Sequence, residues 1–171
     1  MFAEPSCNEY RDLLAKVNDV IWKMDLNMNI TYVSPACERL IGYTQQERLS
    51  QSVESQMTPD SYQRAITFFT NELTRDKEPG VDPNRTGTIE LEYYHKDGGI
   101  RWFENVVSWD RAEDGTIIGI QGISRDITER RLANEAILKS EERYRTLAEE
   151  SPISIMTFDK EGKLLLSTIG T

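Results

Sequence analysis

The sequence predicts an α+β fold in which a mainly antiparallel five-stranded sheet carries helices on one face. Two β-rich segments, 19–25 and 30–34, precede a group of short helical patterns. Three more β-rich segments follow, over residues 88–125, joined by tight turns. Strands joined in this way pair with their neighbours, and helices grouped between two sets of strands cover one face of the sheet. A C-terminal connector helix over residues 128–150 completes the fold.

Turn and cap signals place the elements of the first half. Residues 26–29 contain two asparagines, which suit a tight turn between the first two strands. Ser34 before Pro35 predicts a helix with a serine N-cap, and Gly42 its end. The Thr-Gln-Gln-Glu segment at 44–47 is a capping box for the next short helix. Thr58 starts a longer helix, whose apolar face is formed by Tyr62, Ala65, Ile66, Phe69 and Leu73.

The second half of the domain is expected to be all β. Residues 77–87 hold two prolines and two glycines without any periodicity, so they form a loop. Residues 88–95, 100–109 and 116–125 are β-rich, and Asp-Gly turns separate them. The sequence therefore predicts two successive antiparallel hairpins.

The connector helix over residues 128–150 contains no Gly or Pro and is rich in charge. Its less polar residues follow the 4-3-4-3 spacing of a coiled-coil heptad seam. They are Ala133, Ile137, Tyr144 and Leu147, with Ser140 at the remaining position of the seam. The seam predicts a homodimer that forms through this helix. The alternative is a monomeric linker helix that packs on its own domain.

The pattern at the start of the chain returns near its end. Tyr10 and Asp25 are separated by the same interval as Tyr144 and Asp159. The distance between the two copies is a domain length and not a solenoid repeat. The expected organisation is an N-terminal helix over 1–18, one complete domain over 19–127, the connector over 128–150 and the truncated start of a second domain over 151–171.

Composition excludes several classes of function. The chain of 171 residues has a net charge of −9 and no basic cluster, which argues against nucleic acid and anionic membranes as partners. No apolar run is long enough to cross a membrane, so we expect a cytoplasmic chain, whose parent protein can still be membrane-tethered. Two cysteines and one histidine, His95, provide no zinc site and no nucleophilic or other catalytic motif.

Several short strings, taken in order, carry a family resemblance. They are Tyr-Val-Ser-Pro-Ala at 32–36, Leu-Ile-Gly-Tyr at 40–43, Tyr-His-Lys-Asp-Gly at 94–98, Arg-Trp-Phe-Glu at 101–104, and the segment 119–130 with Asp126-Ile127-Thr128 near its end. Together they resemble the PAS family over residues 8–130, and the pattern restarts at about residue 141.

The resemblance implies a PAS fold and a signal-sensing input domain of a larger signalling protein, for which a sensor histidine kinase is the commonest parent. The partners it implies are a second copy of the chain, downstream signalling domains and a small ligand. A ligand-free dimerisation or spacer module in a cyclic-di-GMP or other signalling protein is the alternative. The cofactor stays open, although residues 59–78 lack the histidine of haem-binding members and the chain lacks the Asn-Cys-Arg motif of covalent flavin adducts.

The family register implies which side chains line an internal pocket. They are Trp22, Met24, Phe69, Phe103, Asn105, Val107, Trp109, Gln121 and Ile123. A buried amide without a partner costs about 1–3 kcal/mol. Asn105 and Gln121 are therefore expected to bond to each other, to backbone and water, or to a ligand. A packed core with a satisfied amide pair is the alternative to a pocket.

The last strand passes into the connector helix at Asp126-Ile127-Thr128. Asp126 is expected to bond the first free N–H groups of the helix and to favour its positive end. Ile127 is expected to anchor the junction in the core. The resemblance implies that this junction relays the state of the domain to the connector helix.

Overall fold

The computed structural model describes residues 18–150 and 155–168. The helix expected over residues 1–18 lies almost wholly outside these described residues. The chain divides into two compact units, 1–128 and 129–171.

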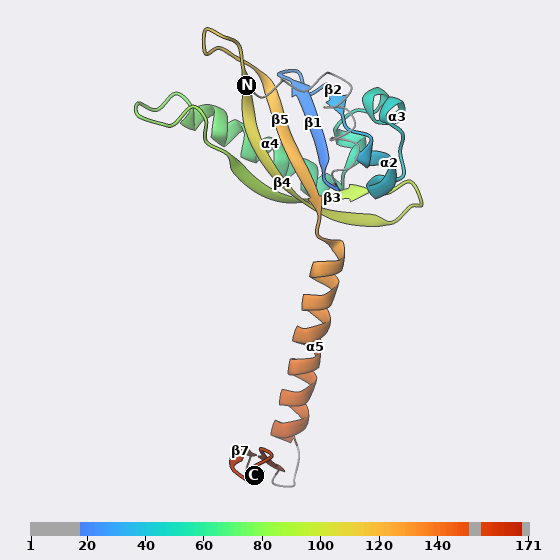
Figure 1. Ribbon diagram of the computed structural model, residues 1–171, viewed down its shortest axis with the longest axis vertical. Coiled ribbons are helices and arrows are strands. Elements are labelled where there is room, and N and C mark those ends of the chain that lie inside the picture. The colour runs from blue at the N-terminus through green and yellow to red at the C-terminus, as the bar shows by residue number, and fades with distance from the viewer. Residues whose placement is uncertain (1–17, 151–154, 169–171) are drawn as a thin grey trace, which may run out of the picture. The chain divides into compact units, whose positions relative to one another are not determined.

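The first unit is built on a five-stranded antiparallel sheet, which confirms the predicted fold class. Its strands are β1 (Val20–Asp25), β2 (Ile30–Val33), β3 (Gly87–Tyr94), β4 (Ile100–Arg111) and β5 (Ile117–Asp126). Their order in the sheet is β2-β1-β5-β4-β3, and every neighbouring pair is antiparallel. The last strand in the sequence, β5, therefore lies in the middle of the sheet (Figure 1).

The helices lie between β2 and β3 in the sequence and cover one face of the sheet (Figure 1). They are α2 (Ala36–Ile41), α3 (Gln45–Ser50), the 3₁₀ turn η1 (Glu54–Gln56) and α4 (Pro59–Arg75). This one-sided arrangement leaves the other face of the sheet without any of these helices.

Local cap chemistry fixes where these helices begin and end. The capping box of α3 is present, because Thr44 Oγ1 accepts from Glu47 N and Glu47 Oε2 accepts from Thr44 N. Gly42, with a φ of 82°, ends α2 as predicted. The predicted serine cap of α2 is wrong. The Ser34 hydroxyl instead accepts a hydrogen bond from Ile21 N of β1 at 3.0 Å, so it ties the turn to the sheet.

The pairing register decides which side chains face the helices. In β1 and β5, Val20 lies opposite Ser124, Trp22 opposite Gly122 and Met24 opposite Ile120. Residues directly opposite each other share a face of the sheet. The same face continues in β4 through Phe103, Asn105, Val107 and Trp109, all of which are buried.

The predicted register of β5 is wrong by one residue. Gln121 and Ile123 lie on the face away from the helices, where Ile123 is 45% exposed. The inward position between Ile120 and Ser124 belongs to Gly122. A Cβ atom at Gly122 would lie 2.6 Å from the Trp22 ring and 2.9 Å from the Val106 carbonyl oxygen, so the indole occupies the space that a side chain would need.

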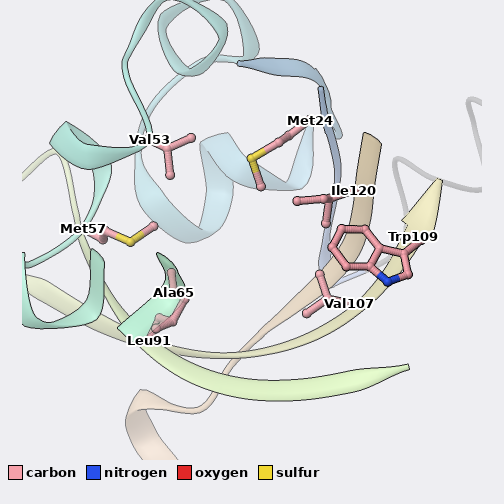
Figure 2. Close-up of a cluster of buried hydrophobic side chains, with 8 residues drawn as sticks. All are labelled: Met24, Val53, Met57, Ala65, Leu91, Val107, Trp109 and Ile120. Atoms are coloured by element: carbon pink, nitrogen blue, oxygen red, sulfur yellow. The ribbon is translucent and has the colours of Figure 1, made fainter. Parts of the chain in front are cut away.

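Two clusters of buried side chains form the core. The larger one joins residues of the sheet to α4 and to the two residues that flank η1, Val53 and Met57. Figure 2 shows its eight buried members directed toward one another. The smaller one surrounds Phe103 and joins α2 to the β1–β2 end of the sheet through Ala36, Cys37 and Ile41.

The second unit contains most of α5 (Thr128–Glu150) and a hairpin of β6 (Ile155–Phe158) and β7 (Leu164–Thr168). The helix is continuous over all of its residues, as predicted. The seam residues Ile137, Tyr144 and Leu147 are each more than half exposed. Among the described residues, no helix has the length and apolar character to span a membrane.

The register of β5 can be tested at Gly122. We expect Gly122→Ala to lower the free energy of unfolding by about 1–3 kcal/mol, because the new methyl group overlaps the Trp22 ring and the Val106 carbonyl group. Urea denaturation measures this change. The neighbouring Ile123→Thr, on the exposed face, is the control and should stay within about 0.5 kcal/mol of wild type. The opposite ranking of the two variants would contradict this register.

Candidate functional site

A cavity of about 60 Å³ lies between the inward face of the sheet and the helical segments α3, η1 and α4. Its walls are almost entirely apolar, and the sheet contributes side chains from all five strands. Apart from Trp109 and Ile120, every residue drawn in Figure 2 also lines this cavity. Apolar walls with a few polar groups are typical of small-molecule sites.

The structure brings six of the nine predicted pocket residues together around this cavity. They are Trp22, Met24, Phe69, Phe103, Asn105 and Val107. Trp109 instead lines a smaller neighbouring cavity of about 20 Å³, beside Phe68 and Ile120. Gln121 and Ile123 line neither cavity, because the register of β5 directs them to the opposite face.

On the sheet wall, Asn105 is the centre of a hydrogen-bond network. Its Oδ1 accepts from Ser124 Oγ and from Tyr93 OH, at 2.5 and 3.2 Å. Its Nδ2 donates to the carbonyl oxygens of Ile89 and Phe103, at 3.2 and 3.0 Å. Trp22 Nε1 donates to Ser124 Oγ at 2.8 Å and extends the network to β1.

This network satisfies Asn105 without a ligand and without Gln121. Of the three alternatives, a hydrogen bond between the two amides is wrong, because the two side chains lie on opposite faces of the sheet. Burial raises the pKa of Tyr93 to about 12, and the nearby charge of Arg48 opposes that rise. The phenol consequently remains protonated at neutral pH and keeps its role as a donor to Asn105.

The helical wall contributes a residue that sequence reasoning missed, Arg48 of α3. It lines the cavity and is only 4% exposed. Hydrogen bonds fix α3 to β2 and to η1. Gln45 Nε2 donates to Val33 O of β2 at 2.6 Å. Gln56 Nε2 of η1 donates to the carbonyl oxygens of Arg48 and Gln51. Hydropathy would predict the opposite burial, with the apolar Leu49 buried and the charged Arg48 exposed. In the structure Leu49 is exposed and Arg48 is buried.

The surroundings of the Arg48 guanidinium group are aromatic. It lies 5.9 Å from the ring centroids of both Tyr43 and Tyr93, near the outer limit of a cation–π contact. Its hydrogen bond from Nη1 to Gln51 Oε1 is long, at 3.4 Å. Nε is buried without a partner, and it is the only such side-chain nitrogen or oxygen atom among the described residues.

The junction between β5 and α5 is fixed by the backbone of Trp102 in β4. The Trp102 N–H group donates to Thr128 Oγ1 at 2.9 Å, and its carbonyl oxygen accepts from Ile127 N at 2.8 Å. Asp126 Oδ1 accepts from Thr128 N at 2.8 Å, the N-terminal cap that the sequence predicts. Ile127 is 2% exposed, so it anchors the junction in the interior.

The residues considered for catalysis lie apart from the cavity. His95 Nδ1 lies 2.8 Å from Asp97 Oδ1 at the turn between β3 and β4. Cys37 is a free, buried thiol of α2, and burial raises its pKa, which keeps the thiol in its unreactive neutral form. In the described part of the chain, no three His, Cys, Asp or Glu residues are grouped to hold a metal ion.

Two curated bacterial proteins are similar to this chain. One is the uncharacterized protein y4lL of Sinorhizobium fredii, 27% identical over 98% of this chain and 20% of its own length. The other is the two-component sensor PprA of Pseudomonas aeruginosa, 28% identical over 74% of this chain and 13% of its own length. The chain thus spans a fifth or less of each of these relatives.

Solved structures share the fold. The PAS domain of a protein from Colwellia psychrerythraea has a TM-score of 0.60 and 24% identity, covering 71% of this chain and 97% of that one. A sensory box histidine kinase/response regulator from Burkholderia thailandensis has a TM-score of 0.60 and 19% identity, covering 81% and 98%. The N-terminal domain of a diguanylate cyclase with a PAS/PAC sensor, from Marinobacter aquaeolei, has a TM-score of 0.50 and 25% identity, covering 66% and 98%.

The profile of the family described as the PAS fold matches residues 8–127. That match contains the whole sheet, the helices that cover it and the cavity between them. The chain therefore belongs to the PAS family.

Proposed function

We propose that this chain is the sensory input module of a multidomain signalling protein, which binds a small molecule in the cavity and relays its presence to α5. One observation carries the proposal: the cavity wall and the helix junction meet at consecutive residues of β4. Phe103 lines the cavity, and the backbone of Trp102 holds Ile127 and Thr128.

The relay rests on the stiffness of this connection. The Phe103 side chain is fully buried and packs edge to face against Tyr93, with ring centroids 5.5 Å apart. A ligand that displaces this ring shifts the backbone of β4, because a close-packed interior transmits displacement to its neighbours. Trp102 then moves with Phe103, and both of its hydrogen bonds to the junction move with it. In this scheme Asp126, Ile127 and Thr128 convert occupancy of the cavity into a new position of α5.

The output of the proposed module is a helix pair. Ile137, Tyr144 and Leu147 are exposed on α5, and they share the heptad seam with Ala133. A homodimer through this seam brings the downstream domains of two chains together. The similarity to the two-component sensor PprA supports a sensor histidine kinase as the parent protein. The predicted cytoplasmic location belongs to the same proposal.

The domain boundaries are also part of the proposal. We assign residues 19–127 to the sensor domain, 128–150 to the connector and 151–171 to the beginning of a second PAS domain. The β6–β7 hairpin supports the last assignment, since a second copy would also begin with two antiparallel strands. The repeated interval between tyrosine and aspartate supports it independently.

The alternative function is a ligand-free dimerisation or spacer module in a cyclic-di-GMP or other signalling protein. The satisfied state of Asn105 favours this alternative, because the sheet wall needs no ligand to complete its hydrogen bonds.

Native mass spectrometry of the purified chain distinguishes the two functions. We expect a bound small molecule in wild type and its loss in Ala65→Leu, because Ala65 is buried in the cavity wall and the larger side chain fills the space. Ala136→Leu, on the exposed surface of α5, is the matched control and should retain the molecule. A molecule that remains bound to Ala65→Leu would lie outside the cavity. If wild type carries no bound molecule, the result would favour the spacer function.

The dimer seam is tested by light scattering. We expect wild type to be a dimer and Ile137→Glu to be a monomer, because two glutamates facing each other in an apolar seam repel and lose hydration. Leu138→Glu makes the same change at an exposed position beside the seam and should remain dimeric. A monomeric wild type, or equal effects of the two variants, would exclude the seam as the interface.

A further inference from the structure

Among the described residues, the buried Arg48 side chain is the one group in the cavity wall that has a buried polar atom without a hydrogen-bond partner. A buried positive charge is costly unless an opposite charge and hydrogen bonds compensate for it. Among the described residues, Arg48 forms no ion pair with any carboxylate. Its Nε has no hydrogen-bond partner, and its bond to Gln51 is at the long limit.

Among the residues that the structure describes, no group near Arg48 supplies the missing negative charge. The groups that interact electrostatically with Arg48 are Tyr93, Cys37 and Tyr43, and none of them is a carboxylate. Burial raises the pKa of Tyr93 and of Cys37, which keeps both neutral. Burial also lowers the pKa of Arg48, yet a guanidinium group stays protonated inside proteins. The helical wall therefore presents an uncompensated cation to the cavity.

The sheet wall, opposite Arg48, has few hydrogen-bonding groups that are free to bind a ligand. Both polar ends of the Asn105 side chain are engaged, Trp22 and Tyr93 donate their hydrogens within the sheet network, and Ser124 both accepts and donates. Most of the other residues that line the cavity, on either side, are aliphatic or aromatic, including Val33, Met57 and Leu91. The cavity thus combines one cationic group with apolar surroundings.

The size of the cavity limits the ligand. A single water needs about 10–15 Å³ of such space. A cavity of about 60 Å³ therefore accommodates a molecule of about four to six non-hydrogen atoms. This range fits a short organic acid.

We propose that the cavity binds a short-chain aliphatic carboxylate, with the carboxylate group on Arg48 and the alkyl chain against the apolar walls. Nε and a terminal Nη of a guanidinium group form a planar fork that matches the two oxygens of a carboxylate. Such a ligand provides Nε with a partner and neutralises the buried charge. This inference rests on the proposed sensory function and names the chemical class that the sensor detects.

Titration calorimetry of the wild-type chain with butyrate and with butyramide tests the proposal directly. The two probes have nearly the same shape, and only butyrate carries a charge. We expect butyrate to bind at least about tenfold more tightly, because only its carboxylate group compensates for Arg48. Equal binding of the two probes, or stronger binding of butyramide, would overturn the proposal.

Variants then assign the preference to Arg48. We expect Arg48→Met to bind the two probes within about threefold of each other, whereas Arg64→Met, an arginine on the exposed side of α4, should keep the wild-type ratio. The apolar replacement should unfold at the same or a higher urea concentration than wild type, since replacing an unpaired buried ion by a hydrophobic side chain is neutral or stabilising. A lower midpoint together with an unchanged probe ratio would show that Arg48 is a structural residue.

The outcomes separate this inference from the function on which it rests. If neither probe binds but native mass spectrometry finds a neutral molecule that Ala65→Leu removes, the sensory function stands and the carboxylate assignment fails. If neither probe binds and no molecule is found, both fail. The wild-type comparison needs no substitution, so it decides the question even where Arg48→Met does not fold.

Discussion

The insertion of β5 between β1 and β4 is the constraint on which the rest of the structure depends. Neither of these strands has the other as a neighbour, so the sheet exists as one unit only when β5 joins its two halves. The register of β5 decides which side chains face the helices, because a slip of one residue reverses every side chain. Gly122 holds that register, since only a residue without a side chain leaves room for the Trp22 indole ring.

This register also explains why the two walls of the cavity differ in character. Ser124 is brought beside Asn105, which lets the sheet complete a hydrogen-bond network that reaches Trp22 and Tyr93. The helical wall has no equivalent network, and Arg48 has no counter-charge among the residues that the structure describes. A protein interior normally satisfies its buried polar groups, so an exception in a cavity wall has functional weight.

Much of the fold could be predicted from the sequence because its signals are local. The Thr44–Glu47 capping box, the glycine end of α2 and the uninterrupted α5 each depend on a few adjacent residues. The face of β5 could not be predicted, because isoleucines occupy both alternating sets of positions and the inward set includes Gly122. Arg48 could not be recognised either. Whether an arginine in a short helix is solvated or buried depends on how that helix packs, and here the packing buries Arg48 while it exposes Leu49.

The cavity is connected to the β5–α5 junction through the side chain of one residue, Phe103, and the backbone of the next, Trp102. This division has an evolutionary consequence. Phe103 contacts the cavity through its ring, whereas Trp102 holds Ile127 and Thr128 through its peptide N–H and carbonyl groups. Peptide groups are the same whichever residue carries them. In the proposed relay, substitutions at the cavity wall can therefore change which ligand is bound, while the backbone hydrogen bonds of Trp102 to the helix junction are kept. A module built in this way can acquire new inputs without a new output having to evolve at the same time.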